Sequence, residues 1–427
     1  MKRMIAAFLA LVMLLSLSAC GQGTAPGEAT AEPATIETAN VEDLNKPAEA
    51  GNTDAIDETE SLDADGLFEL GWKYEYGEGV KKNYKESLKL YNQAAEAGSA
   101  KAMNHLGYLY ETGAHGLIKK DLEKALEWYT KAAEAGNVDA MNTVGYMYAL
   151  GEGVEQDFAK ALEWYTKAAE AGNADAQAYI GSLYLYGDGV EQDYAKALEW
   201  YTKAAEGGST DALGGIGWLY QHGYGVEQDD AKALEWYTKA AEGGDVDVQA
   251  HIGWLYLNGD GVEQDYAKAL EWFTKAAGAG NAYAMNDIGW MYQNGFGVEQ
   301  DYDKAFEWFT KGAEAGDSGA MHNLGVMYEN GFGVEQDYAK ALEWYTKATG
   351  AGNADAMNNI GWMYRNGFGV EQDYAKALEW FTKAAEAGSA DAMYNLGVMY
   401  ANGYGVEPDQ AKADEWYAKA KAAGYSG

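Results

Sequence analysis

The chain has 427 residues, and 31 lysines and arginines against 67 aspartates and glutamates give it a formal net charge of −36. With 48% hydrophobic and 13% aromatic residues, it has enough apolar material for a core, which excludes a wholly disordered protein. So acidic a surface repels phosphate backbones, which excludes nucleic acid as a partner. The single cysteine, Cys20, excludes intramolecular disulfides and cysteine-based metal sites.

The first residues have the features of an export signal. Two basic residues precede an apolar run from Met4 to Leu15, which is short for a membrane span, since a span needs about 20 apolar residues. Leu17-Ser18-Ala19-Cys20 resembles the lipobox of bacterial lipoproteins. The resemblance implies that residues 1–19 are a signal peptide removed before Cys20, whose thiol carries a lipid. The alternative is an ordinary signal peptide with an incidental cysteine.

Residues 21–63 differ in composition from the rest of the chain. They are mostly alanine, glutamate, threonine, proline, aspartate and glycine, with almost no aromatic or long aliphatic residues. Such a segment buries too little apolar surface to offset the entropy of ordering it. With Cys20, it is predicted to be a lipid-bearing, disordered acidic tether over residues 20–63.

Residues 64–427 repeat one unit ten times. A glycine that follows an apolar residue recurs every 36 residues, except for a spacing of 38 between the second and third copies. These glycines are Gly71, Gly107, Gly145, Gly181, Gly217, Gly253, Gly289, Gly325, Gly361 and Gly397. The two extra residues fall in the turn Ala114-His115-Gly116-Leu117. A fixed period of this size predicts a solenoid of stacked units.

Each unit is predicted to contain two helices. In the clearest copy the first runs from Asp355 to Arg365 and the second from Tyr374 to Ala387. The residue that opens a unit is always serine, asparagine or aspartate, the residues that best cap a helix N-terminus. These residues are Ser99, Asn137, Asn173, Ser209, Asp245, Asn281, Asp317, Asn353 and Ser389. An aspartate such as Asp373 precedes each later second helix, and a glycine such as Gly388 follows it, as is typical of C-termini.

The recurring segments Ala-x-Ala-Met-x-x-Leu-Gly-x-Met-Tyr, Gly-x-Gly-Val, Lys-Ala-Leu-Glu-Trp-Tyr and Lys-Ala-Ala-Glu-x-Gly resemble the Sel-one-like repeat family, relatives of tetratricopeptide repeats. The resemblance covers about residues 64–424. It implies an all-α fold, an α/α solenoid that winds as a right-handed superhelix. It also implies an adaptor that holds protein complexes together.

One face of the first helices has the composition of a recognition surface. Counting about 100° per residue from the recurring glycine, one arc is nearly invariant between copies and is predicted to be core. The opposite arc varies and carries large aromatic residues beside amides, which suit recognition. The predicted binding residues are Trp72, Tyr108, Tyr146, Trp218, Trp254, Trp290, Trp362, Asn286, Asn323, Asn358 and Asn359. The alternative is that these tryptophans pack between repeats.

A second tryptophan series, represented by Trp272 and Trp308, is nearly the same in every copy and is predicted to be core. The histidines do not share a metal-site spacing, and no nucleophile has a partner base. We therefore expect no enzyme activity, no cofactor and no metal. The sequence predicts an exported, lipid-anchored scaffold that faces outward from the cell envelope. Its groove would bind a protein or extended peptide, neutral or basic in charge. A glycan-binding surface protein that uses the tryptophan row is the alternative.

Overall fold

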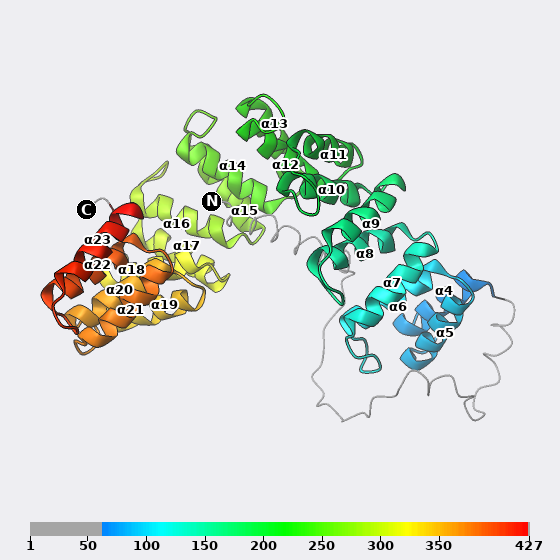
Figure 1. Cartoon of the computed structure of the whole chain (residues 1–427), viewed down its shortest axis with the longest axis horizontal. Coiled ribbons are helices and arrows are strands. Elements are labelled where there is room, and N and C mark those ends of the chain that lie inside the picture. Colours follow the sequence, from blue (N-terminus) through cyan, green and yellow to red (C-terminus); the bar gives the residue numbers. More distant parts are fainter. Residues whose placement is uncertain (1–61, 426–427) are drawn as a thin grey trace. The chain divides into compact units, whose positions relative to one another are not determined.

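The computed structural model describes residues 62–425, and helices α4–α23 make up most of this range (Figure 1). The first helices of the ten repeats are α4 Ala64–Tyr76, α6 Ala100–Thr112, α8 Val138–Leu150, α10 Ala174–Tyr186, α12 Thr210–His222, α14 Val246–Asn258, α16 Ala282–Asn294, α18 Ser318–Asn330, α20 Ala354–Asn366 and α22 Ala390–Asn402. The second helices are α5 Tyr84–Glu96, α7 Leu122–Glu134, α9 Phe158–Glu170, α11 Tyr194–Glu206, α13 Asp230–Glu242, α15 Tyr266–Gly278, α17 Tyr302–Glu314, α19 Tyr338–Gly350, α21 Tyr374–Glu386 and α23 Gln410–Ala422. This part of the chain contains no strand, and none of its helices is long and apolar enough to cross a membrane.

The helices form two compact units that divide within α13, between Trp236 and Tyr237. Inside each unit, helices pack on the next one along the chain, as α10 does on α11 and α16 on α17, and first helices of neighbouring repeats also touch, as α16 and α18 do. This is the packing of a solenoid. The predicted all-α solenoid of two-helix repeats is confirmed, and the helix bounds agree with the predicted ones to within about a residue. The predicted lipid site and most of the tether lie outside the described residues.

Side-chain caps begin the helices, as the repeat pattern predicts. The Asn281 side chain accepts the backbone N–H of Ala284 at 2.8 Å, and Asp301 accepts that of Lys304 at 3.0 Å. The cap predicted at Ser209 is wrong in one respect, because its side chain makes no cap hydrogen bond although it precedes α12. Local sequence therefore determines the helix starts in nearly every copy.

The loop between the two helices of a repeat ties that repeat to the one before it. In Gly295-Phe296-Gly297, both glycines have positive φ angles, 75° and 70°. A Cβ on Gly297 would lie 2.7 Å from the Cβ of Tyr266, at the start of the preceding second helix. The Phe296 ring packs on the Tyr266 ring with centroids 5.1 Å apart. The loop glycine is thus required both by its φ and by this close approach.

The recurring glycine of the first helices faces an aromatic ring of the following second helix in nine of the ten repeats. A Cβ on Gly289 would lie 2.7 Å from Cδ1 of Phe309, and one on Gly325 would lie within the same distance of Tyr345. Phe309 and Tyr345 are fully buried. The recurring glycine therefore leaves the space that the ring fills, and in repeats such as these two the pair lies at the centre of the core.

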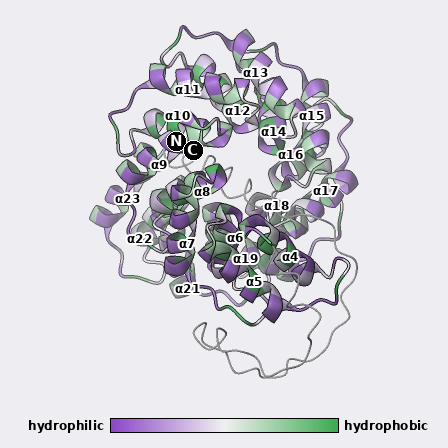
Figure 2. Ribbon diagram, turned by 90° about the vertical axis from the view of Figure 1, so that its right-hand side faces the viewer, coloured by the Kyte–Doolittle hydropathy of each residue, from purple (hydrophilic) through white to green (hydrophobic). Residues whose placement is uncertain are grey.

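Apolar and polar residues alternate along the helices, as Figure 2 shows by hydropathy. The second tryptophan series lies at the rim of the core and is half-buried, so the prediction of core holds only in part. Trp308, for example, packs on a core cluster with one side, while the Nζ of Lys311 lies 4.2 Å from its ring centroid. Lysine stems and charges cover the outer sides of these rings.

We call the space that the recurring glycine leaves for the aromatic ring the notch. Replacement of the notch glycine Gly289 by alanine should destabilise the second unit. In Gly289→Ala the new methyl group would overlap the Phe309 ring, so we expect a loss of about 1–3 kcal/mol in the free energy of unfolding. Gly278→Ala is the matched control, because nothing lies within 4 Å of a Cβ there and its φ is ordinary. Thermal and urea unfolding followed by circular dichroism would measure both. Equal stability of the two variants would contradict the claim that the Phe309 ring leaves no room for a side chain at Gly289.

Candidate functional site

Exposed large apolar side chains gather on the first helices. Within residues 62–425 the structure has nine such side chains, and seven of them lie on first helices. The seven are Tyr76, Tyr108, Leu150, Trp254, Tyr283, Trp290 and Tyr394. Leu62 precedes α4, Tyr224 lies in a loop, and none lies on a second helix. We call the side of the first helices that carries the predicted binding residues the first-helix face.

The predicted aromatic residues of the first unit differ in exposure. Tyr108 on α6 is 48% exposed. Trp72 on α4 is half-buried against Tyr76, with ring centroids 4.5 Å apart, and Trp218 on α12 stacks on His222 at 4.4 Å. Tyr146 on α8 departs from the expectation of a free surface, because it is only 8% exposed and belongs to a core cluster. Packing of the next repeat covers that ring.

In the second unit, two of the three predicted tryptophans are largely exposed. Trp254 on α14 is 46% exposed and Trp290 on α16 is 40% exposed. Trp290 rests one side of its ring on Phe296, with centroids 4.8 Å apart. Trp362 on α20 makes the same contact with Phe368, at 4.9 Å, but is half-buried. Supported at one side and free at the other, Trp290 offers a fixed apolar surface to a ligand.

The four predicted asparagines join neighbouring first helices. Asn323 Nδ2 on α18 donates to Asn286 Oδ1 on α16 at 2.8 Å. Asn359 Nδ2 on α20 donates to His322 Nε2 on α18 at 3.1 Å. Asn395 on α22 donates in the same way to Asn358 on α20, at 2.9 Å. We call this row from α16 to α22 the amide ladder. It fixes the spacing of the helices and places polar groups beside the exposed aromatic rings.

A carboxyl group that sequence reasoning missed lies on the same face. Asp287 follows Asn286 on α16 and is half-buried. Burial, together with the nearby charge of Asp317, raises the pKa of Asp287 to about 7. The sequence contains one sign of this site. The residue two positions before the recurring glycine is asparagine in each of the next three repeats, whereas in this repeat it is Asp287.

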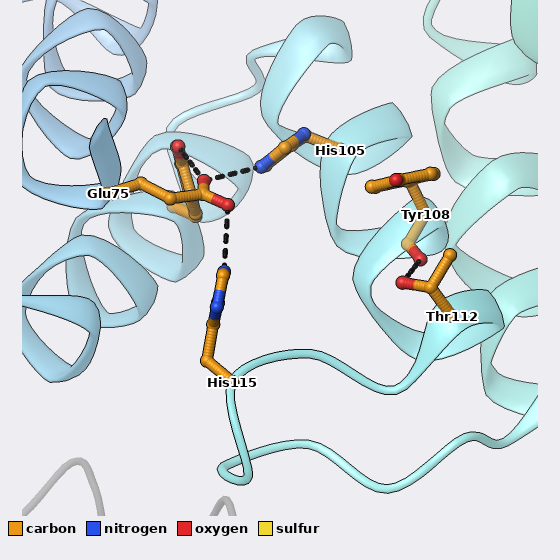
Figure 3. A network of polar contacts seen from close by, with 6 residues as sticks. Glu75, His105, Tyr108, Thr112 and His115 are labelled. Atoms are coloured by element: carbon orange, nitrogen blue, oxygen red, sulfur yellow. Dashed lines mark hydrogen bonds and ion pairs between the residues drawn. The ribbon is translucent and has the colours of Figure 1, made fainter. Parts of the chain in front are cut away.

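A hydrogen-bond network in the first two repeats, which includes two histidines, was also not predicted from the sequence (Figure 3). The buried carboxylate of Glu75 accepts a hydrogen bond from Tyr91 Oη at 2.6 Å. His105 Nε2 lies 2.8 Å from one of its oxygens, and His115 Nε2 lies 3.0 Å from the other. Burial by itself raises the pKa of Glu75, but the hydrogen bonds from His105, Tyr91 and His115 outweigh burial and lower the pKa to about 2.

His115 reaches Glu75 because of the two-residue insertion in the second repeat. It adopts a left-handed φ of 56°, and its ring stacks on Tyr84 with centroids 3.7 Å apart. Sequence spacing could not show that this loop returns to the buried carboxylate. Within the described range no three histidine, cysteine or acidic side chains are placed to hold a metal ion. The Glu75 network ties the first two repeats together through these hydrogen bonds.

Comparison with known proteins gives a family and several solved structures. The model of the Sel1 repeat family matches ten consecutive segments over residues 64–425. A protective antigen of uropathogenic Escherichia coli strains with an SLR fold is 36% identical, with a TM-score of 0.61, over 90% of this chain and 79% of that one. A Sel1 repeat protein from Oxalobacter formigenes is 36% identical, with a TM-score of 0.53, over 59% of this chain and 100% of that one. No protein with a curated description matches.

The Glu75 network should make the first two repeats sensitive to acid. Because the pKa of Glu75 in the folded chain lies below the ordinary 4.5, its stabilising effect is complete above about pH 4.5 and is lost as the pH falls toward 2. Glu75→Gln should reduce stability at pH 7 by about 1–3 kcal/mol and flatten this acid loss. Hydrogen exchange of α4–α6 as a function of pH measures both effects.

Glu69→Gln on α4 is the control for Glu75→Gln, since Glu69 is exposed. It should exchange like the parent protein at every pH. If Glu75→Gln also follows the parent through this range, the network does not stabilise the fold.

Proposed function

The chain belongs to the Sel1 repeat family, and we propose that it is a scaffold that binds a partner protein through the first-helix face. Proteins of this family typically act as scaffolds for protein–protein interactions. The observation that supports the proposal best is that exposed large apolar side chains gather on the first helices and are missing from the second helices of the described range. Exposed aromatic residues on one face are typical of an interaction surface.

The proposed ligand is an extended, neutral or basic segment of a partner protein. Neighbouring helices pack about 10 Å apart, and an extended chain advances about 3.3 Å per residue, so every third residue of a bound segment would meet a new first helix. Trp254 and Trp290, on successive first helices, supply contact area, and the amide ladder supplies hydrogen-bonding groups beside them. The formal charge of −36 disfavours an acidic partner.

Glycan binding is the second candidate function. The specific observation in its favour is that the rings of Trp254 and Trp290 are 46% and 40% exposed, because sugars also bind by stacking on exposed aromatic faces. The chemistry of a captured ligand distinguishes the two candidates.

We further propose that the protein is exported and held at the cell envelope by a lipid on Cys20, with the repeats facing outward. The support is the sequence alone: a charged start, a short apolar run and the segment Leu17-Ser18-Ala19-Cys20. Two or more acyl chains would give a stable attachment to a bilayer.

Removal of two exposed tryptophans should abolish partner binding without unfolding the protein. The tagged full-length protein would be used to capture ligands from cell-envelope extract, in parallel with a Trp254→Ser/Trp290→Ser variant. We expect the parent to hold a protein that the variant loses, with at least a tenfold decrease in recovery, because these are the two most exposed of the predicted tryptophans.

The matched control for this capture is Glu307→Ser/Glu343→Ser, which changes two exposed residues on second helices. This variant should retain the partner, and circular dichroism should show equal helical content in all three proteins. Equal capture by the tryptophan variant would overturn binding through the first-helix face. Capture of a polysaccharide would favour the glycan candidate.

Substitution of the lipid site should release the protein from the membrane. In Cys20→Ser the thiol that would carry the lipid is absent, so the protein should move from the membrane fraction to the soluble fraction. Membrane fractionation and mass spectrometry of the N-terminal peptide measure this. A parent protein whose N-terminal peptide carries no lipid would contradict the anchor.

A further inference from the structure

Asp287 stands where the amide ladder ends. Each ladder residue two positions before its recurring glycine, namely Asn323, Asn359 or Asn395, donates to a side chain on the preceding first helix. Asp287 occupies the same position on α16, and the corresponding residue on α14 is Ala250, whose methyl group donates nothing. Within the described range, no hydrogen bond or ion pair involves the Asp287 carboxyl group. It is therefore half-buried without a partner of its own.

The first helices around Asp287 carry no fixed positive charge; the lysines of the neighbouring second helices α15 and α17 pair with carboxylates of their own helices or lie over aromatic rings. Helices α14, α16 and α18 contain no lysine or arginine. The nearby carboxyl group of Asp317, whose charge acts on Asp287, also has a raised pKa, chiefly because it is buried. A cation brought by a partner would meet two partly desolvated carboxyl groups, and no lysine or arginine of these first helices would compete with it. Such a site attracts positive charge more strongly than an exposed acidic surface does.

Exposed aromatic rings stand on either side of Asp287 along α16. Tyr283 lies four residues before it and is 62% exposed, and Trp290 lies three residues after it and is 40% exposed. Residues three and four apart share a helix face, so the three side chains form one patch. The patch combines an acid with π-surface and apolar surface, which is what the long stem and charged end of a basic side chain require.

The second helices of the same chain show what completes such a patch. On α15, Lys275 Nζ lies 4.2 Å from the ring centroid of Trp272 and 2.9 Å from Glu271 Oε1. One lysine thus contacts a tryptophan ring and a carboxylate together, and α11 and α21 repeat the arrangement. On α16 the tryptophan and the carboxyl group are present, but no lysine of the helix accompanies them.

We propose that the patch of Tyr283, Asp287 and Trp290 receives a lysine or arginine side chain from an extended segment of a partner protein. The ammonium or guanidinium group pairs with the Asp287 carboxylate, and the stem lies along the Trp290 ring. This inference rests on the proposed scaffold function and specifies its ligand: a basic residue defines the register of the bound segment. Neutral segments without such a residue bind more weakly.

Direct binding of a defined peptide tests the proposal. The probe is a fluorescent twelve-residue peptide of glycine and serine with lysine at every third position, and its counterpart has norleucine in place of lysine. Fluorescence anisotropy with the full-length protein in mild detergent, at pH 8 and low salt, measures both affinities. We expect the parent to bind the lysine peptide at least tenfold more tightly than the norleucine peptide. Equal affinities would overturn the proposal.

Asp287→Asn isolates the carboxylate while keeping its shape. It should weaken binding of the lysine peptide about tenfold and leave the norleucine peptide unaffected. Asp391→Asn is the matched control, since it removes one charge from an exposed position on α22 and should change the affinity less than twofold. Equal weakening by both variants would show that only the diffuse negative charge matters, and this would overturn the proposal.

Two further readouts separate a binding role from a structural one. Asp287→Asn should raise the thermal midpoint at pH 8, because it removes a partly desolvated charge without a partner, whereas loss of a structural residue would lower it. The variant should also lose the natural partner captured by the parent. A partner that needs Trp254 and Trp290 but not Asp287 would leave the scaffold function standing and overturn this inference alone.

Discussion

The architecture of this chain depends on one contact, an aromatic ring pressed against a glycine. In each pair, as in Gly289 with Phe309, the ring lies where the side chain of any other residue would stand. The contact sets how closely the two helices of a repeat approach each other. Because it recurs from repeat to repeat, the two helices of these repeats meet in the same way. The residues on the opposite side of these helices are then free to differ from copy to copy.

Local features of the structure were predictable from the sequence, since their causes are local. The caps at Asn281 and Asp301 bond to backbone groups only three residues away, and the loop glycines have φ angles that their neighbours require. The ten-fold period made these signals easy to recognise. At Ser209 the residue type was right but the cap hydrogen bond is absent, so composition alone did not decide the geometry.

The site was less predictable because exposure depends on the neighbouring repeat. Tyr146 and Tyr108 occupy equivalent positions, yet one is buried and the other is 48% exposed. The amide ladder joins residues 37 positions apart, such as Asn286 and Asn323. A search for asparagine pairs separated by one residue more than the repeat length would have found it. The contact of His115 with Glu75 depends on the path of an inserted loop, for which a helical pattern gives no indication.

The array separates its charges between its two sets of helices. In the second unit, lysines lie on second helices, where they pair with aspartate caps or cover tryptophan rings, as Lys304 pairs with Asp301 at 3.2 Å. First helices α14, α16 and α18 keep their acids without such partners. In this unit the lysines are therefore concentrated on the second helices, and the acids of these first helices have no lysine partner.

Near-identical repeats allow wrong helix pairings during folding, because the aromatic ring of one second helix can pack against the recurring glycine of a first helix from another repeat. Helices from different copies can therefore associate wrongly and delay folding. The Glu75 network breaks this degeneracy, since a shifted pairing would bury its carboxylate without His105, Tyr91 and the inserted His115. The irregular second repeat thus favours the correct register at the start of the array, because helix pairings shifted by one repeat would leave the Glu75 carboxylate without these partners.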